Sequence, residues 1–334
     1  MRIILAAIAA MLTLPAPARA EEIEQAAIDA AKKEGKVSLY TSFIGNPLHM
    51  NVVKTFEQKY GISVEVYDAR ATEINERVRT EQTTGRFLAD DFQNGQATLE
   101  RLEKEQGILQ PSGDLPNAKF LRAAHPATAT RAPSYILGYG ILANVNLVKP
   151  DDEPKSWTDL ADPRWKGKIM SDDMRAAGGG AILFAATHDA LGADFHRKLA
   201  LNDIVFSRDV GVDEKRVAAG EFPLRMPQLI SNMLLLKGLP VRFVMPREGA
   251  PYVRFDLAVL KNAPHPNAAR LFINHYLGEQ AQVMYANGAL IPVIEGAAAK
   301  ASAETRAFAS VKLMGTTKPE TQEAMYALAK DIYK

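Results

Sequence analysis

The chain has 334 residues, of which 24% are charged, with a formal net charge of +1 and no cysteine. This balance, without any run of lysine or arginine, does not suggest nucleic acid or an anionic membrane as a partner. The absence of cysteine excludes disulfide bonds, thiolate metal sites and cysteine nucleophiles, and also a bacterial lipoprotein anchor, which requires a cysteine at its cleavage site.

The N-terminus has the pattern of a secretory signal. Arg2 precedes an apolar run over residues 3–14, and Ala18-Arg19-Ala20 ends in a small-residue cleavage site. The run is too short for a lasting membrane span. We therefore predict cleavage after Ala20 and export to the periplasm. Removal of Arg2 and Arg19 changes 40 basic and 39 acidic residues to 38 and 39, a formal charge of −1.

Strands and helices are expected to alternate over the first hundred or so residues. Alternating β-branched and aromatic residues indicate strands, and apolar residues at helical spacing before a glycine indicate helices. Three strand–helix units in succession favour a largely parallel sheet with helices on its faces. The expected elements are strands over 36–43, 62–67 and 88–92 and helices over 47–60, from a capping Thr72, and over 98–106.

A long, glycine-punctuated run over residues 134–145 can leave one sheet and enter another. A second series follows it, beginning with a helical turn capped by Ser156 and Asp159. A second extended run over 253–260 leads back. The other elements expected here are strands near 166–170, 204–206, 222–225 and 241–244 and helices after Gly178–Gly180, over 227–237, from 266 to 278, up to 288 and over 319–334.

Two α/β series joined by two extended runs predict an α/β fold with two lobes and a cleft between them. We expect lobe 1 to comprise residues 21–134 and 250–285. Lobe 2 should comprise residues 135–249 and 286–334, with the C-terminal helical tail. We expect a monomer.

The stretch from Trp157 to Ile169 closely resembles a motif of the extracellular solute-binding proteins of ABC importers. Leu88–Phe92 and Ala263–Ala269 resemble segments of the ferric-ion-binding branch, and the likeness spans residues 36–295. The resemblance implies a type II periplasmic binding fold with two crossing strands as its hinge. It also implies a small-molecule ligand, held between the lobes and delivered to an ABC permease in the inner membrane.

One feature of the ferric-ion-binding branch is missing. Its iron-binding members carry adjacent tyrosines after a Gly-Glu strand of the second lobe. Here that strand begins at Gly220-Glu221, the matching positions fall near Ile230 and Ser231, and no two tyrosines are adjacent anywhere. Ferric iron prefers phenolate and carboxylate oxygens, so this departure argues against iron. Relatives for phosphonates, sugar phosphates, thiamine and organic acids remain, with ferric iron and a synergistic anion as the alternative.

Loops at strand ends in both lobes should supply the ligand contacts. The glycine run Gly178–Gly180 can bring backbone N–H groups to an anion, and arginine can hold a carboxylate or phosphate by two hydrogen bonds. We therefore expect a small, polar, anionic solute. The candidate ligand-binding residues are Thr41, Ser42, Arg70 and Asn94 in the first lobe and Tyr139, Asp172, Arg175, Arg225 and Gln228 in the second.

Each candidate also has a structural interpretation. The hydroxyls of Thr41 and Ser42 can simply cap a turn, and Tyr139 can pack at the hinge. The arginines can be solvated or paired with Asp172 or Asp173, and the glycine run can be only a tight loop, because it lacks the Lys-Ser/Thr of a phosphate-binding P-loop.

An enzyme on a similar scaffold is a further hypothesis. No nucleophile–base signature supports it, so we predict a binding protein. The pair Asp90-Asp91 can act as acid and base, but solvated loop carboxylates are commoner. We expect neither a metal nor another cofactor, because the histidines lack metal-binding spacing and read as surface or capping residues: His49, His125, His188, His196, His265 and His275.

Overall fold

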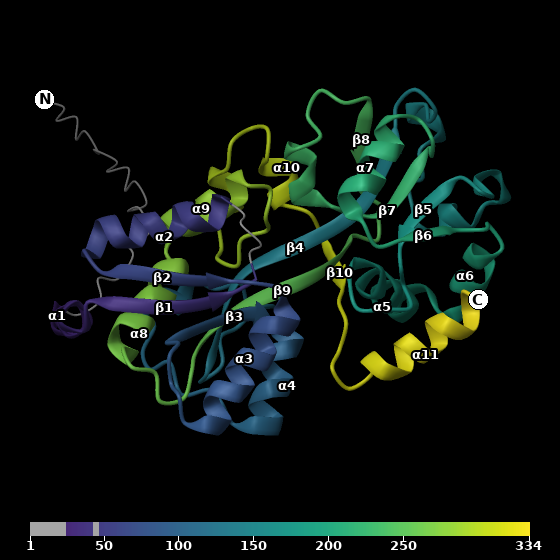
Figure 1. Cartoon of the computed structure of the whole chain (residues 1–334). Coiled ribbons are helices and arrows are strands. Elements are labelled where there is room, and N and C mark those ends of the chain that lie inside the picture. Colours follow the sequence, from purple (N-terminus) through teal and green to yellow (C-terminus); the bar gives the residue numbers. More distant parts are fainter. Residues whose placement is uncertain (1–24, 43–46) are drawn as a thin grey trace, which may run out of the picture.

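The computed structural model describes residues 25–42 and 47–334, so the predicted signal segment lies outside the described residues. Two groups of strands and helices lie side by side and are joined by long strands (Figure 1). These strands are β4, Arg131–Asn144, and β9, Ala250–Val259. The predicted α/β organisation in two lobes is confirmed. Among the described helices, none has the length and apolar character needed to cross a membrane.

The first lobe is built on the strand order β2-β1-β3-β9-β4. The first three strands are parallel, with Leu39 opposite Val66 and Asp91, whereas β9 is antiparallel to both β3 and β4. Parallel neighbours bring their C-terminal ends to one edge, which here faces the second lobe (Figure 1). The three parallel strands are β1 Lys36–Thr41, β2 Ser63–Asp68 and β3 Asp91–Gly95.

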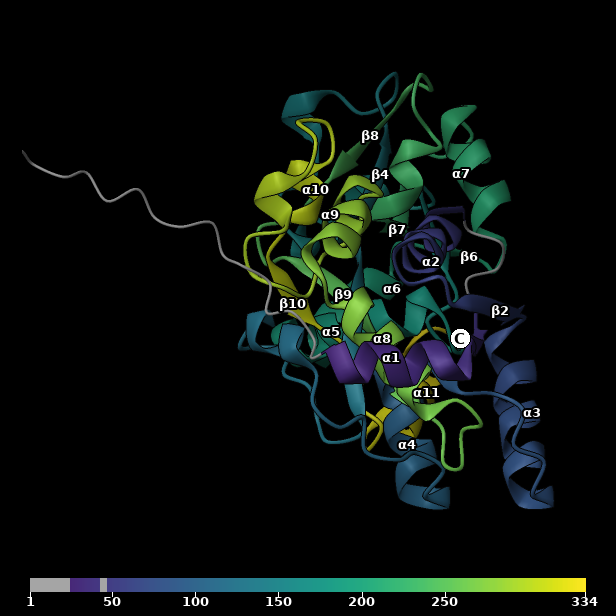
Figure 2. The ribbon, with the colours of Figure 1, turned by 90° about the vertical axis from the view of Figure 1, so that its left-hand side faces the viewer.

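Helices cover both faces of this sheet. Successive β1 side chains point to opposite faces, so they pack into two different hydrophobic cores. Val37 and Leu39 belong to one hydrophobic core, and Tyr40 belongs to another together with residues of α3 and α4. Figure 2 shows α1 lying along α8 on the first of these faces. The helices are α1 Gln25–Glu34, α2 Pro47–Tyr60, α3 Ala71–Thr84, α4 Gln96–Gln106, α8 Pro266–Tyr276 and α9 Glu279–Asn287.

The second lobe has its own core around the buried Trp157 and Phe184. The C-terminal helix contributes Ala329 to this core, as expected for a tail packed on the outside of the lobe. The strands are β5 Ile169–Asp172, β6 Val205–Ser207, β7 Leu224–Leu229 and β8 Val241–Val244. The helices are α5 Gly179–Leu191, α6 Ala193–Ala200, α7 Val210–Ala218 and α11 Gln322–Ile332.

Strand β4 belongs to both sheets. Its first part, Arg131–Gly138, pairs with β9, and its second part, from Tyr139 on, pairs with β7 and β8. A further short strand, β10 (Leu313–Gly315), pairs with the start of β9 and packs on α5. The sequence did not predict β10, because three residues are too few for a recognisable alternation.

Some predicted elements are wrong. A helix over 227–237 is replaced by the end of β7 and a short 3-10 turn over Ile230–Leu234, because Tyr139 and Gly140 of β4 pair with Leu229 and Gln228. Thr72 does not cap α3, whose N-cap is Arg70. The helices α6 and α7 were not predicted. The third strand begins at Asp91, three residues after the predicted start, which shifts the strand end to Gly95.

The chain after α9 continues in the first lobe. Leu290, Val293 and Ala297 lie in the same core as Tyr135 and Tyr285. A short helix, α10 (Arg306–Ala309), packs on α9. We propose that lobe 1 extends beyond the predicted boundary at residue 285 and that the chain leaves it near β10.

Candidate functional site

The end of β1 is tied to both crossing strands by a chain of hydrogen bonds. Thr41 donates from Oγ1 to Gln93 Oε1 at 3.1 Å, and Gln93 Nε2 donates to Ser134 Oγ at 3.0 Å. Ser134 Oγ donates in turn to the carbonyl of Phe255 at 2.9 Å. The first two hydrogen bonds join side chains of β1, β3 and β4, and the third reaches the backbone of β9. Thr41 therefore fixes the strand end, a role that the sequence could not assign because Gln93 and Ser134 carry no local signal.

The other first-lobe candidates differ in their exposure to solvent. Asn94 is buried, donates from Nδ2 to Asn75 Oδ1 at 2.9 Å and accepts from the Gly95 N–H at 2.7 Å, so it joins β3 to α3. Ser42 is half-buried just after β1, and Arg70 is exposed at the start of α3. Ser42 and Arg70 are thus the more accessible of these candidates.

In the second lobe Tyr139 and Asp172 come together around the start of α5. A Cβ added to Gly179 would lie 3.2 Å from Tyr139 Cε1 and 3.3 Å from Asp172 Oδ2, so the backbone of Gly179 passes close to both side chains. Asp172 Oδ2 accepts a hydrogen bond from the Gly180 N–H at 2.8 Å. Burial, with a smaller effect of Asp172, raises the pKa of Tyr139, whose phenol therefore stays protonated near neutral pH.

Arg225 and Gln228 form a buried polar network behind Tyr139. Arg225 is 1% exposed and donates from Nη1 to Gln228 Oε1 at 3.2 Å, while its Nε lies 3.8 Å from Asp213 Oδ2. Gln228 Nε2 donates to Glu214 Oε1 at 2.6 Å. The two acids come from α7, which was not predicted from the sequence, and their negative charges partly offset the cost of burying a charged arginine.

Arg175 is engaged with Asp173 and with the C-terminal end of the chain. Its Nε and Nη2 donate to the two oxygens of Asp173 at 2.8 and 3.2 Å, and its Nη1 donates to the carbonyl of Tyr333 at 3.2 Å. Its guanidinium also lies over the ring of Phe206. The pairing with Asp173 is the alternative that the sequence had left open for this arginine, and ligand contact by Arg175 stays a prediction.

The aspartate pair at the start of β3, Asp90 just before the strand and Asp91 in it, is not solvated, which corrects that interpretation. Asp90 and Asp91 are both 0% exposed. Asp90 accepts from the backbone N–H groups of Ser38 and His265 at 2.8 and 2.7 Å, so it is a structural acceptor. Burial and the neighbouring Asp90 raise the pKa of Asp91 well above its usual value.

The interpretation of the histidines as surface or capping residues is wrong for four of them. Burial lowers the pKa to about 3 for His49 and His196 and to about 4 for His125 and His275. The sequence did not show that these histidines are buried, because a histidine in a core and a histidine on a helix surface look the same in a pattern of apolar residues. Within residues 25–42 and 47–334, no three His, Asp or Glu side chains form a group suited to a metal ion.

Comparison with known proteins agrees with this architecture. An uncharacterized protein of Haemophilus influenzae is 24% identical over 268 residues, 76% of each chain. The iron- and citrate-bound FutA of Trichodesmium superposes with a TM-score of 0.74 at 22% identity, covering 90% of this chain and all of that one. The apo ferric ion-binding protein A of Pasteurella haemolytica gives 0.73 at 20% identity, covering 89% and 98%.

A substrate-binding protein of an ABC transporter from Agrobacterium tumefaciens gives a TM-score of 0.72 at 16% identity, covering 92% of this chain and 97% of that one. At these identities the likeness concerns the fold, and it confirms the type II two-lobed architecture. Residues 95–313 match a protein family described as bacterial extracellular solute-binding protein. This match covers more than half of the sequence, and the chain belongs to the family of bacterial extracellular solute-binding proteins.

Proposed function

We propose that this chain captures a small polar solute between its two lobes and passes it to an ABC permease. The observation that carries the proposal is the shared strand β4. Ser134 on its first part belongs to the first-lobe polar chain, and Tyr139 on its second part stands beside Asp172 in the second lobe. One strand thus links polar groups of both lobes, and bending of β4 and β9 would bring the lobes together on a ligand.

The accessible and the engaged candidates have different parts in this proposal. We assign ligand contact to Ser42 and Arg70 in the first lobe and to Tyr139 and Asp172 in the second. Positioning is assigned to the residues whose polar atoms are already engaged with other groups: Thr41, Asn94, Arg225 and Gln228.

This division also suggests the chemistry of the solute. Arg70 would hold an acidic group, because a guanidinium pairs with two carboxylate or phosphate oxygens. Asp172 would accept a hydrogen bond from a hydroxyl or amino group, and Tyr139 would donate one. We therefore propose a small solute that carries an acidic group and at least one hydroxyl or amino group.

Residence in the periplasm, a monomeric state and the absence of catalysis belong to the same proposal. Membership of an extracellular family supports export. No step of catalysis is needed for a component that only binds and delivers, and Asp90 and Asp91 are held inside the first lobe rather than at its surface.

The test is mass spectrometry of the small molecule released by denaturing protein purified from the periplasm. Wild-type protein should release one dominant polar solute, and a Tyr139→Ala, Asp172→Ala double variant should release much less. Re-addition of that solute should reduce the radius of gyration in solution scattering of the monomer. Release of the same molecules by both proteins, or tight binding without a change of shape, would contradict the proposal.

A further inference from the structure

A pocket of about 370 Å³ lies between the first lobe, strand β9 and the segment that leads into α11. The first turn of α4 supplies Gln96, Ala97 and Thr98, and β9 supplies Arg254. His125 and residues 316–320 also line the pocket. None of the residues assigned to solute contact above lines this pocket, so it is a separate feature of the molecule.

The start of α4 offers unpaired backbone donors to this pocket. The helix has 11 residues, and its N-cap is Gly95, a residue without a side chain to cap it. Within the described residues, the side-chain oxygen of Asn94 accepts from the Gly95 N–H and not from the helix. In the described chain no acceptor is found for the N–H groups of Gln96, Ala97 and Thr98, which line the pocket. Free N–H groups and the helix dipole together favour a negative charge at such a position.

His125 provides an independent sign that a ligand belongs there. The residue is 5% exposed and lines the pocket, and no hydrogen-bond partner of its ring nitrogens is found among the described residues. Burial, assisted by Arg254 and Arg122, lowers the pKa of His125 to about 4, so the neutral ring has one N–H to donate near pH 7.

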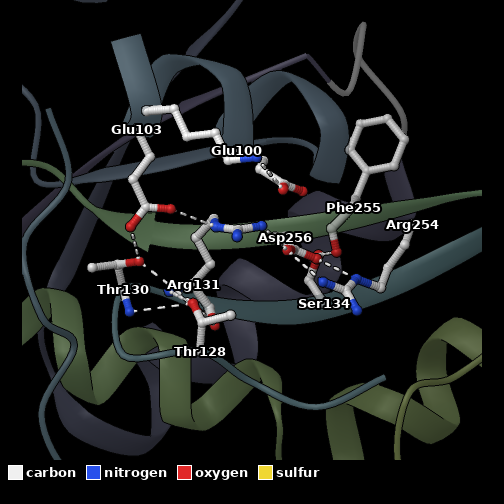
Figure 3. A network of polar contacts seen from close by, with 10 residues as sticks. Glu100, Glu103, Thr128, Thr130, Arg131, Ser134, Arg254, Phe255 and Asp256 are labelled. Carbon is white, nitrogen blue, oxygen red and sulfur yellow. Dashed lines mark hydrogen bonds and ion pairs between the residues drawn. The ribbon is translucent and has the colours of Figure 1, made fainter. Parts of the chain in front are cut away.

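Arg254 is held in place with one nitrogen left over. It is 6% exposed, and its Nε and Nη2 donate to the two oxygens of Asp256 at 2.7 and 2.9 Å (Figure 3). Asp256 is held from its other side by Arg131 Nη1 at 3.5 Å. No partner of Arg254 Nη1 is found in the described part of the chain. A guanidinium fixed in this way needs little reorganisation to bind a further acceptor.

The negative groups around the pocket are partly balanced. Glu100 pairs with Lys104 at 3.1 Å, and Lys318, which pairs with Asp189 at 2.7 Å, also lines the wall. Glu320 lies on the same segment as Lys318. These charges leave room for one small negative group, and they disfavour a large polyanion.

We infer that this pocket is a binding site for one small oxyanion, a carboxylate or a phosphate, held by the first N–H groups of α4, the His125 ring and Arg254. The site is distinct from the proposed solute site. It lies between a first-lobe helix and the segment leading to α11, which packs on the second lobe, so its occupant would contact both sides of the hinge.

The test is nuclear magnetic resonance of the labelled exported protein during titration with acetate, succinate or inorganic phosphate. At least one probe should shift the amide signals of Gln96, Ala97 and Thr98 in a saturable way, and comparison of the three probes separates carboxylate from phosphate binding. The amides of Ala71 and Gly180 report the proposed solute site separately. Shifts confined to those two residues, or no saturable shift with any probe, would overturn the inference.

Variants then test the geometry. Thr98→Asp places a carboxylate in the first turn of α4, where it favours the helix and fills the site, so the fold should persist and probe binding should be lost. His125→Phe should weaken binding by about fivefold, the value of one neutral hydrogen bond. Gln280→Asp adds the same charge to the first turn of α9, outside the pocket, and should leave binding unchanged. Undiminished binding by Thr98→Asp would overturn the inference.

Discussion

The carboxylate of Asp172 accepts a hydrogen bond from the backbone N–H of Gly180 at 2.8 Å, in the first turn of α5. The chain itself thus places a negative charge where a bound anion would otherwise interact with the helix start. The glycine run permits this approach, because a Cβ on Gly180 would lie 2.5 Å from the carbonyl oxygen of Asp172. Asp172 is therefore both a cap of α5 and a proposed solute contact.

Replacement of Asp172 separates these two parts. Asp172→Ala should reduce the free energy of unfolding by about 1–2 kcal/mol, as loss of a capping side chain does. Asp172→Asn keeps an acceptor oxygen and should recover most of that stability, but not the affinity for a solute that donates to a charged carboxylate. Urea unfolding and calorimetric titration measure the two effects. Asp151→Ala, at an exposed position, is the control; an alanine variant at 172 as stable as this control would contradict the capping role.

The arginines should respond differently to truncation. Arg70→Ala should weaken binding of the identified solute by about tenfold or more, because a hydrogen bond from a charged donor contributes ~1.5–3 kcal/mol. Its melting temperature should hardly change, since Arg70 is exposed. Arg70→Lys keeps the charge but loses the planar pair of donors, so it should recover only part of the affinity. Calorimetric titration measures each variant.

Arg175→Ala is the matched comparison. Its guanidinium holds Asp173 and the carbonyl of Tyr333, so truncation should lower the melting temperature and loosen the C-terminal end of the chain. Thermal unfolding and the proteolysis rate near α11 measure this. Equal loss of affinity in Arg70→Ala and Arg175→Ala, with unchanged stability in both, would favour ligand contact by both arginines.

The elements with complete local signals were predicted well from the sequence. Helix α2 runs over Pro47–Tyr60 as predicted, because Pro47 suits the first helical position and Gly61 adopts a left-handed φ of 69° after the last. The capping box of Ser156 and Asp159 is also present. In such cases the physical cause lies within a few residues, so a single sequence is sufficient.

The candidate site was harder to predict because its contacts join distant segments. Gln228 is held by Glu214, on a helix that the apolar spacing did not indicate, and Thr41 by Gln93 from another strand. The partner of Asp172 is a backbone N–H, which cannot be predicted from residue types because every residue except proline has one. Which polar side chain remains accessible depends on these partners, and a linear pattern does not contain them.

The iron alternative has a visible signature. Ferric iron bound by tyrosinate would give a charge-transfer colour, and Tyr139 is the one tyrosine among the candidate residues. Burial raises the pKa of Tyr139, which opposes the ionised form that iron requires. We therefore expect no visible absorption band on addition of ferric citrate, measured by spectrophotometry at neutral pH. A band that is lost in Tyr139→Phe would contradict this expectation.

The last prediction concerns the buried Asp91. Its pKa is raised well above the usual value, and within the described residues neither carboxyl oxygen has a hydrogen-bond partner. The folded protein keeps this proton at a pH where the unfolded chain, with a pKa of about 3.9, has lost it. The stability contributed by Asp91 is thus fully present below pH ~4 and is lost as the pH rises toward the folded-state pKa, by up to ~1.4 kcal/mol per pH unit.

Asp91→Asn removes this proton uptake while keeping the shape of the side chain. The variant should match the wild type near pH 4 and become progressively more stable than the wild type toward pH 7, as urea unfolding at several pH values would measure. Asp90→Asn, at the residue directly before the strand, is the control. Asp90 accepts hydrogen bonds from Ser38 and His265, so its replacement should destabilise the fold at neutral pH. A difference between Asp91→Asn and the wild type that does not change with pH would show that Asp91 is ionised in the folded protein.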